Sequence, residues 1–312
     1  MKNIWYWLFN TEEDKELLEK KKLRWEIKSS KIKTTMFLLA LFAEIVILYF
    51  VAKSYGLIED SVVLGKKIAV IDFNKEVTQT YVNTIIKSLK KAKKDKDYKE
   101  VLFIMNSPGG SPTASDELSE YLKDYQTHKP LTMYIQGIAA SGGYYIASAI
   151  KPLYSNKNAI VGSIGVIMPH YNFGELAQKI GVEEDDLSAG EFKKPISFFK
   201  KLQPKEKAYL KKQILTPMYN NFIAAVALNR ELNITEVEKY AEGKVYMANN
   251  PDIQNILIDK IISLITLKNR IKKRYNNSIS FVNILPKDPI GLLGSKIEFN
   301  LNLDKNLMPT LK

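Results

Sequence analysis

The sequence predicts an α/β protein with a mostly parallel sheet, preceded by one N-terminal transmembrane helix. Near the start, residues 34–52 form a 19-residue stretch that is almost entirely apolar. From about residue 66 onward, short apolar runs typical of strands alternate with segments of helical periodicity, which indicates repeated βαβ units. Turns rich in Gly and Ser follow several of these runs, where strands are expected to connect to helices.

The composition limits the possible classes of function. The chain has 312 residues, 46% of them hydrophobic, which is enough to bury a core and excludes a wholly disordered protein. The absence of cysteine excludes disulfides, thiolate metal sites and a cysteine nucleophile. Only two histidines are present, His128 and His170, so we expect no metal and no cofactor. The net charge of +12 would suit nucleic acid or anionic lipid, but basic and aromatic residues are not interleaved, so no nucleic-acid partner is expected.

The segment 34–52, TTMFLLALFAEIVILYFVA, predicts the transmembrane helix. At a rise of 1.5 Å per residue it spans roughly 28 Å, close to the hydrocarbon thickness of a bilayer. Lys28, Lys31 and Lys33 precede it and favour a cytoplasmic N-terminus, which places the rest of the chain outside the cytoplasm. The alternatives are a buried core helix and a cleaved signal peptide, although no A-x-A site follows the segment.

Glu44 lies near the middle of this apolar segment, where a charged residue costs roughly 2.5–3.5 kcal/mol on insertion scales. Two interpretations are open: a protonated carboxyl on a single anchor, or a polar contact between the anchors of an oligomer. The chain is therefore expected to divide into five parts. These are a cytoplasmic segment (1–33), a transmembrane helix (34–52), a linker (53–65), an α/β domain (66–275) and a C-terminal extension (276–312).

The elements of the α/β domain are expected in βαβ order. Apolar, β-branched runs predict strands at residues 66–73, 101–105, 131–135 and 166–168. Helical spacing predicts helices at residues 77–94 and 112–125, from the small residues 139–143 to about 149, and in two pieces within 204–241. The residues from 276 onward are rich in Asn, Pro and Gly and are expected to be irregular.

Two predicted junctions between a strand and a helix concentrate the chemistry, since active groups in α/β sheets collect at such points. Ser141 lies at a predicted helix N-terminus, where free amides favour developing negative charge. That position suits a serine nucleophile, whose attack on a carbonyl creates an oxyanion; an ordinary N-cap is the alternative. Gly110 follows the strand at 101–105 and can offer a second unhindered amide.

A serine nucleophile also needs a base. Histidine is the usual base, and lysine can serve where burial lowers its pKa towards neutrality. The chain has 46 Lys and Arg side chains, so composition alone leaves the choice open.

Three motifs rich in Gly and Ser follow one another along the chain: NSPGGS at 106–111, AASGGYY at 139–145 and GSIGV at 162–166. With GEFK at 190–193, GKVY at 243–246 and LID at 257–259, they resemble the signal peptide peptidase A family over about residues 66–260. The stretch SAGEFK at 188–193 is similar to the SohB branch of that family. The resemblance implies a ClpP/crotonase-like fold and a membrane-anchored serine–lysine peptidase.

The motif positions carry the family's site residues onto this chain. The resemblance implies that Ser141 is the nucleophile, that Lys193 is its base and that the Ser163 hydroxyl orients the lysine. It also implies that the amides of Gly110 and Gly142 form the oxyanion hole. Nucleophile, base, orienting group and oxyanion hole together make a complete set for peptide hydrolysis.

Two other side chains are alternatives for the base. Many relatives have Asp after the lysine and Ser-Pro further on, whereas this chain has Lys194 and Ser197-Phe198. A second cation could lower the pKa of Lys193, and it also makes Lys194 a candidate. His170 is the other alternative, because ClpP-type peptidases use Ser-His-Asp and it follows the predicted nucleophile helix by a short distance in sequence.

The expected protein is a single-pass serine endopeptidase of the bacterial inner membrane, with its catalytic domain outside the cytoplasm. The resemblance implies that it degrades signal peptides or short membrane-derived peptides. It also implies a homo-oligomeric ring, in which Lys193 of one chain can meet Ser141 of another. Two alternatives are a crotonase-like acyl-thioester enzyme and a catalytically inactive membrane scaffold of the same fold.

Overall fold

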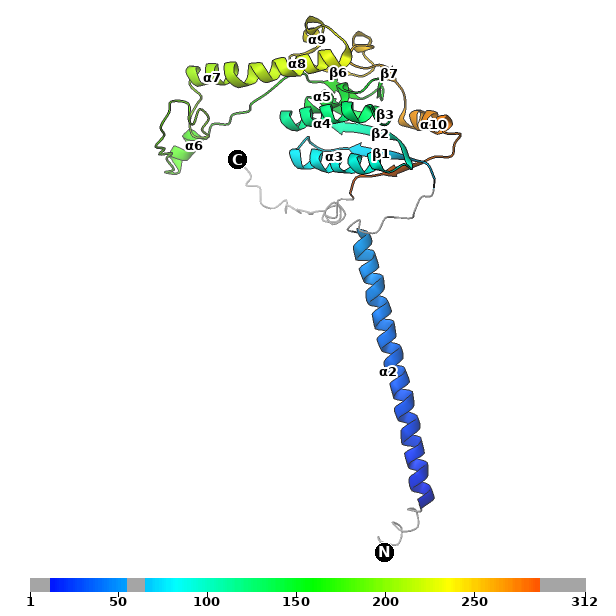
Figure 1. Cartoon of the computed structure of the whole chain (residues 1–312). Helices are drawn as coiled ribbons and strands as arrows, with labels where there is room; N and C mark the ends of the chain where they lie inside the picture. The colour runs from blue at the N-terminus through cyan, green and yellow to red at the C-terminus, as the bar shows by residue number, and fades with distance from the viewer. Residues whose placement is uncertain (1–11, 55–64, 287–312) are drawn as a thin grey trace, which may run out of the picture. The chain divides into compact units, whose positions relative to one another are not determined.

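The computed structural model describes residues 12–54 and 65–286 (Figure 1). The chain divides into two compact units, one of which contains the long helix α2, while the other contains the α/β fold. The expected N-terminal residues 1–11, most of the expected linker and the end of the expected C-terminal extension lie outside the described residues.

Helix α2 (Glu12–Ser54) has 43 residues and contains the whole predicted transmembrane segment. Its length is about 65 Å at 1.5 Å per residue, roughly twice the hydrocarbon thickness of a bilayer. Among the described helices, α2 alone is long and apolar enough to cross a membrane, between Glu19 and Ala52. Successive apolar residues such as 36–39 cover every face of the helix. The charged residues before the apolar segment continue the same helix.

The α/β unit contains an eight-stranded sheet with the order β6-β5-β3-β2-β1-β8, in which β4 lies beside β3 and β7. All strand pairs are parallel except β5 with β6. The predicted α/β class and mostly parallel sheet are therefore confirmed. The strands are β1 (Lys67–Phe73), β2 (Tyr98–Ser107), β3 (Leu131–Ala140), β4 (Leu153–Ser155), β5 (Ile160–Gly162), β6 (Val245–Met247), β7 (Lys260–Ile261) and β8 (Ser280–Asn283).

The helices follow the strands in the alternating order that βαβ units require. The described helices of this unit are α3 (Gln79–Lys94), α4 (Pro112–Gln126), α5 (Gly142–Ser148), α6 (Gly174–Lys179), α7 (Pro204–Leu210), α8 (Thr216–Arg230), α9 (Ile234–Tyr240) and α10 (Leu264–Arg274). A π-turn, η1 (Lys211–Leu215), joins α7 to α8, and a 3-10 turn, η2 (Pro251–Ile253), follows β6.

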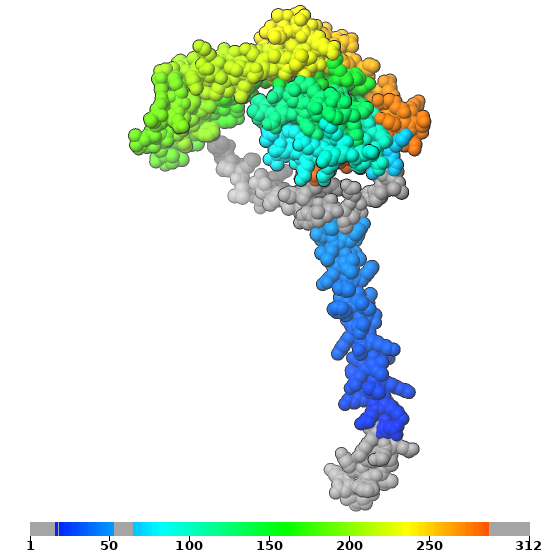
Figure 2. All heavy atoms as spheres, in the orientation of Figure 1, coloured from blue at the N-terminus to red at the C-terminus, as the bar shows by residue number. Residues whose placement is uncertain are grey.

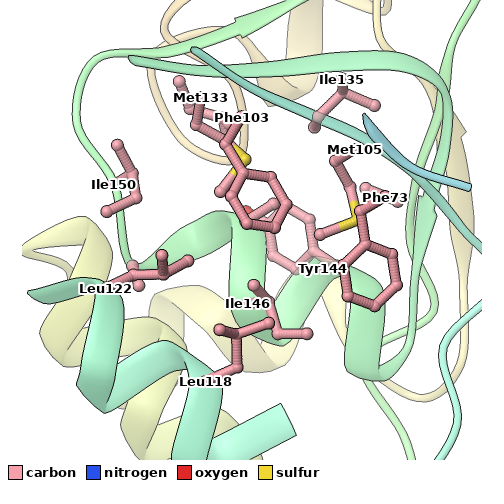
Figure 3. Close-up of a cluster of buried hydrophobic side chains, with 14 of the residues drawn as sticks. Phe73, Phe103, Met105, Leu118, Leu122, Met133, Ile135, Tyr144, Ile146 and Ile150 are labelled. Atoms are coloured by element: carbon pink, nitrogen blue, oxygen red, sulfur yellow. The ribbon is translucent and has the colours of Figure 1, made fainter. Parts of the chain in front are cut away.

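Both faces of the central strands are buried, which explains why they read as continuous apolar runs. Alternate residues of a strand point to opposite faces. On one face, Phe103 and Met105 of β2 meet Tyr144 and Ile146 of α5 and side chains of α4 (Figure 3). On the other face, residues such as Leu102 pack with α10 in a second, smaller cluster.

Strand β3 pairs with two different neighbours and leads directly to Ser141. Its first half pairs with β4 and its last three residues pair with β5. Between these halves, the Asn106 side chain accepts a hydrogen bond of 3.1 Å from the Ile138 amide. A Cβ on Gly137 would lie only 2.7 Å from the Asn106 Oδ1 atom, so a larger residue there would have to displace the Asn106 side chain. This contact bridges the register shift between β2 and β3.

Two predictions about strands are wrong. Residues 166–168 form no strand; the strand is instead β5, and it ends at a turn where Gly162 and Ser163 have φ of 105° and 52°. Residues 280–283 were expected to be irregular but form β8, which pairs in parallel with β1. The backbone groups at the outer edge of β1 need hydrogen-bond partners, and the backbone of β8 supplies them. Strands β2 and β3 also run further than predicted, to Ser107 and Ala140.

Candidate active site

Ser141 occupies a strained turn between β3 and α5. Its φ is 51° and its ψ is −126°, a conformation that residues other than glycine rarely adopt and that proteins concentrate at functional sites. The Ser141 amide donates a 2.9 Å hydrogen bond to the Gly162 carbonyl, and its own carbonyl accepts from the amides of Tyr144 and Tyr145. These bonds hold the turn from both sides. The Ser141 side chain makes no capping hydrogen bond, so the structure does not support the N-cap alternative.

The amides of Gly110 and Gly142 lie close to one another beside Ser141. A Cβ built on Gly142 would lie 3.4 Å from the Gly110 nitrogen. Gly110 has a φ of 148°, and any side chain there would clash with the Val77 carbonyl. The neighbouring amides of this turn are used: Gly109 donates to Ser107 Oγ, and Ser111 donates to the Val77 carbonyl. Neither the Gly110 amide nor the Gly142 amide donates a hydrogen bond to another described residue, and two free neighbouring amides are what an oxyanion requires.

Ser163 lies next to Ser141 across the sheet, because Ala140 of β3 pairs with Gly162 of β5. Its amide donates a 2.6 Å hydrogen bond to the Lys244 carbonyl, and its φ is positive. The structure therefore brings together four of the five predicted site residues: Ser141, Ser163, Gly110 and Gly142.

A cavity of about 550 Å³ opens beside Ser141. Its walls come from the start of α4, the start of α5, the segment after β5 and helix α8. They are largely apolar, with a few polar groups, which is typical of a site for a small or extended ligand. The lining residues are Gly110, Pro112, Thr113, Ser115, Asp116, Ser141, Gly142, Tyr145, Gly165, Val166, Ile167, Met218, Asn221, Phe222 and Ala224.

Lys193 is not among the residues that line this cavity. It is exposed and lies in the segment between α6 and α7, where its amide donates to the Gly190 carbonyl. Figures 1 and 2 show this segment, with α6, standing apart from α4 and α5. Within one chain, the predicted nucleophile and the predicted base are therefore not brought together, and the assignment of Lys193 stays a prediction.

Lys194, the neighbouring candidate, is engaged by two carboxylates. It pairs with Glu184 at 2.6 Å and with Asp186. Hydrogen bonds to Asp186 and Glu184 raise the pKa of Lys194 above its ordinary value. A base must be a neutral amine, so these partners make Lys194 a poorer base than an unpaired lysine.

His170 lines a different cavity, of about 440 Å³, between the segment after β5 and helices α7 and α8. Its Nε2 atom lies 2.8 Å from the Ser197 carbonyl oxygen, so this nitrogen carries the proton and donates it. His170 does not line the cavity beside Ser141.

Two polar side chains in the Ser141 cavity were not expected as site residues. Tyr145 of α5 donates a 2.6 Å hydrogen bond to Asp116 of α4. Burial, followed by this bond and the negative charge of Asp116, raises the pKa of the Tyr145 hydroxyl well above its ordinary value. Tyr145 belongs to the AASGGYY motif, but Asp116 looks in sequence like any acidic residue on a helix surface.

Comparisons with known proteins show what the chain is similar to. The model of peptidase family S49 matches residues 123–277, which include Ser141 and Lys193. The Clp protease model matches residues 58–161, from before β1 into β5, and confirms the expected ClpP-like fold. A solved structure of a ClpP1 mutant from Listeria monocytogenes is 15% identical, with a TM-score of 0.42, and covers 62% of this chain and 91% of its own.

Several proteins are similar in sequence. A candidate protease of Methanocaldococcus jannaschii is 35% identical over 169 residues, which is 54% of this chain and 53% of that protein. Protease 4 of Haemophilus influenzae is 31% identical over 208 residues, covering 66% of this chain and 33% of that protein. A candidate signal peptide peptidase SppA of Enterococcus faecium is 32% identical over 174 residues, covering 55% of this chain and 50% of that protein. The chain thus spans about half the length of these relatives or less. With its motifs and its ClpP-like fold, the chain belongs to peptidase family S49, as a member of the SppA/SohB type.

Proposed function

We propose that this protein is a serine peptidase in which Ser141 attacks the carbonyl carbon of a peptide bond. The observation that carries the proposal is the strained Ser141 turn at a cavity, with the amides of Gly110 and Gly142 free beside it. These groups serve an acyl transfer, because the negative charge that develops on the carbonyl oxygen falls where two amides can accept it. Membership of family S49 supports the same reaction.

The reaction proceeds through an ester on Ser141. Lys193, as a neutral amine, takes the proton of the Ser141 hydroxyl while the oxygen bonds to the substrate carbonyl. The resulting ammonium gives this proton to the leaving amine as the carbon–nitrogen bond breaks. The amine then takes a proton from water, which attacks the ester and releases Ser141. The Ser163 hydroxyl keeps the Lys193 nitrogen directed towards Ser141.

We propose further that Lys193 reaches Ser141 from a second copy of the chain. Residues 167–199, here called the arm, expose several large apolar side chains. Ile167 is 84% exposed, and the others are Tyr171, Phe173, Leu176, Ile180, Leu187 and Phe198. An apolar surface of this kind on one segment is typical of a protein–protein interface. A homo-oligomer would cover the arm and carry Lys193 to a neighbouring cavity.

Complementation between two inactive variants tests the dyad. Ser141→Ala and Lys193→Ala should each lose at least about a thousandfold in kcat/KM on peptides. Co-assembling the two variants should restore turnover, because some sites then combine an intact Ser141 with an intact Lys193. A mixture of Ser141→Ala with the double variant is the matched control and should stay inactive. Full activity of Lys193→Ala, with loss in His170→Gln, would overturn the lysine assignment.

The substrates we propose are signal peptides or short membrane-derived peptides. The cavity beside Ser141 is mostly apolar, which suits such sequences. The relative from Enterococcus faecium carries a matching name. Incubating wild-type and Ser141→Ala protein with a signal-peptide library, followed by mass spectrometry, tests this. Products that depend on Ser141 support the proposal, and identical spectra for the two proteins contradict it.

We propose that α2 anchors the chain as a single-pass bacterial inner-membrane protein. The N-terminus then lies in the cytoplasm and the α/β unit, assigned to residues 66–275, outside it. The length and apolar character of α2 and the lysines before residue 34 support this. Protease added to intact spheroplasts should digest the α/β unit and spare an N-terminal tag. Recovery of the protein in the soluble fraction would contradict the anchor.

A further inference from the structure

The cavity beside Ser141 contains one carboxylate in a wall without any cation. None of its lining residues is Lys, Arg or His. Asp116 supplies the carboxylate, from the first turns of α4, one helical turn after Pro112. In the part of the chain that the structure describes, Asp116 forms no ion pair with a basic side chain. This absence is notable in a chain with 46 basic side chains.

Tyr145 fixes the position of this carboxylate. Its hydroxyl donates a 2.6 Å hydrogen bond to one carboxylate oxygen, Oδ1, and leaves Oδ2 without a protein donor among the described residues. The Tyr145 ring packs against Phe222 of α8, with ring centroids 5.1 Å apart, so the ring itself is held in place. Because burial and the negative neighbour raise the pKa of the hydroxyl, it remains a donor throughout the neutral range.

We propose that Asp116, held by Tyr145, is a specificity-determining residue that binds a positively charged group of the substrate close to the bond that Ser141 cleaves. The group is a lysine or arginine side chain, or the free amino terminus of a short peptide. The apolar remainder of the cavity, including Val166, Met218 and Phe222, receives the neighbouring apolar residues. Preferred substrates therefore combine an apolar stretch with one cationic group. This inference rests on the proposed function.

The attraction has a clear physical origin. The Asp116 side chain is solvent-exposed, so its attraction for an incoming cation is the modest one of an exposed ion pair, with no cation of the cavity wall to compete. A substrate carboxylate in the same place would be repelled. Tyr145 acts through Asp116 and is a positioning residue.

Quenched fluorescent peptides test the inference. Each peptide is an apolar sequence in which one position at a time carries lysine, norleucine or glutamate, and a parallel set has a free or an acetylated amino terminus. At one position, or at the free amino terminus, the wild-type protein should prefer the cationic peptide by roughly fivefold or more in kcat/KM. The preference should appear mainly in KM, because the cation binds away from the reacting atoms.

Variants of Asp116 and Tyr145 then assign the preference. Asp116→Asn should abolish it, so that the lysine and norleucine peptides have the same kcat/KM in this variant. Asp116→Lys should prefer the glutamate peptide. Tyr145→Phe should weaken the preference by raising KM for the cationic peptide relative to KM for the norleucine peptide. Glu120→Gln is the matched control: Glu120 lies one turn further along the same face of α4, pairs with Lys123 and does not line the cavity.

The failures are distinguishable. If the norleucine peptide is cleaved through Ser141, but wild type and Asp116→Asn show the same order of peptides, this inference is overturned and the peptidase proposal stands. Loss of the preference in Glu120→Gln as well would also overturn the inference, since the preference would then depend on the total negative charge of α4 and not on Asp116 in particular. If the wild type cleaves no peptide of either set, the proposed function fails and this inference fails with it.

Discussion

Gly109 lies directly against Ser141: a Cβ on Gly109 would lie 2.7 Å from the Ser141 Cβ and 2.9 Å from the Gly142 nitrogen. The turn after β2 therefore closes on the turn after β3, and the two meet at Ser141. The proposed oxyanion hole depends on this close approach of two backbones with no side chain between them.

Gly109→Ala should lower kcat/KM by about 10²–10³, because the added methyl pushes the Ser141 side chain or the Gly142 amide out of place. Peptide turnover and labelling of Ser141 by a phosphonate both measure this. Gly65→Ala is the matched control. Its φ is 107°, against 106° at Gly109, but no atom lies within 4 Å of the added methyl. A similar loss of activity in both variants would mean that backbone strain, and not the contact with Ser141, is responsible.

Asn106→Ala should destabilise the α/β unit by about 1–3 kcal/mol, because the Ile138 amide loses its acceptor at the bend of β3. Urea unfolding followed by circular dichroism measures the change. Asn158→Ala, at an exposed position, is the control and should leave the midpoint nearly unchanged. An unchanged midpoint in Asn106→Ala would show that β3 keeps its bend without this side chain.

The buried pair of Arg230 and Asp259 should make stability depend on acid pH. Arg230 Nη2 lies 2.6 Å from the Asp259 carboxylate, and the Leu153 amide donates to the same group at 2.6 Å. Burial opposes the charge of Asp259, but the hydrogen bonds and positive charge of Arg230 outweigh it and hold the pKa of Asp259 below its ordinary value of 3.8. The stabilisation is thus present above that value and is lost as the pH falls through the native pKa.

Asp259→Asn should therefore cost about 3 kcal/mol at pH 7, because it leaves the Arg230 charge buried without its partner. The difference from the wild type should shrink as the pH falls below about 4. Chemical unfolding at a series of pH values measures both. Asp252→Asn, which removes an exposed carboxylate, should show little difference at any pH. A constant difference between Asp259→Asn and wild type down to the lowest pH would contradict this account.

His170→Gln should leave kcat/KM on peptides essentially unchanged. The Nε2 proton of His170 is donated to the Ser197 carbonyl, and the glutamine side chain can donate to the same oxygen. Steady-state kinetics with the peptides used for Ser141→Ala measure this. A complete loss of activity with an unchanged unfolding midpoint would instead favour the serine–histidine alternative.

Much of the fold could be predicted from local patterns in the sequence. Strand β1 and helix α3 could be predicted because their apolar spacing is long and regular, and the junction at Ser141 because small residues follow a strand. Strand β5 has only three residues, which is too short for its sequence pattern to identify it as the strand in preference to the apolar run at 166–168. Strand β8 depends on a partner about two hundred residues earlier, which no local pattern reveals.

Some residues of the candidate site could likewise be predicted from the sequence, and others could not. Ser141, Ser163, Gly110 and Gly142 lie on turns whose backbone conformation requires small residues, so their motifs are visible in the sequence. Asp116 could not be predicted as a site residue, because an acidic residue on a helix surface is ordinary in sequence and only the folded structure places this one in the cavity. The position of Lys193 depends on the arm, and its assignment stays a prediction.

The separation of Ser141 from Lys193 within one chain has a consequence for control in the cell. If the proposed dyad forms between two chains, a newly made, solitary copy would be inactive, since neither half of the dyad can act alone. Activation would then respond to crowding: once enough copies meet in the plane of the membrane, proteolysis would switch on, and dilution would silence it again.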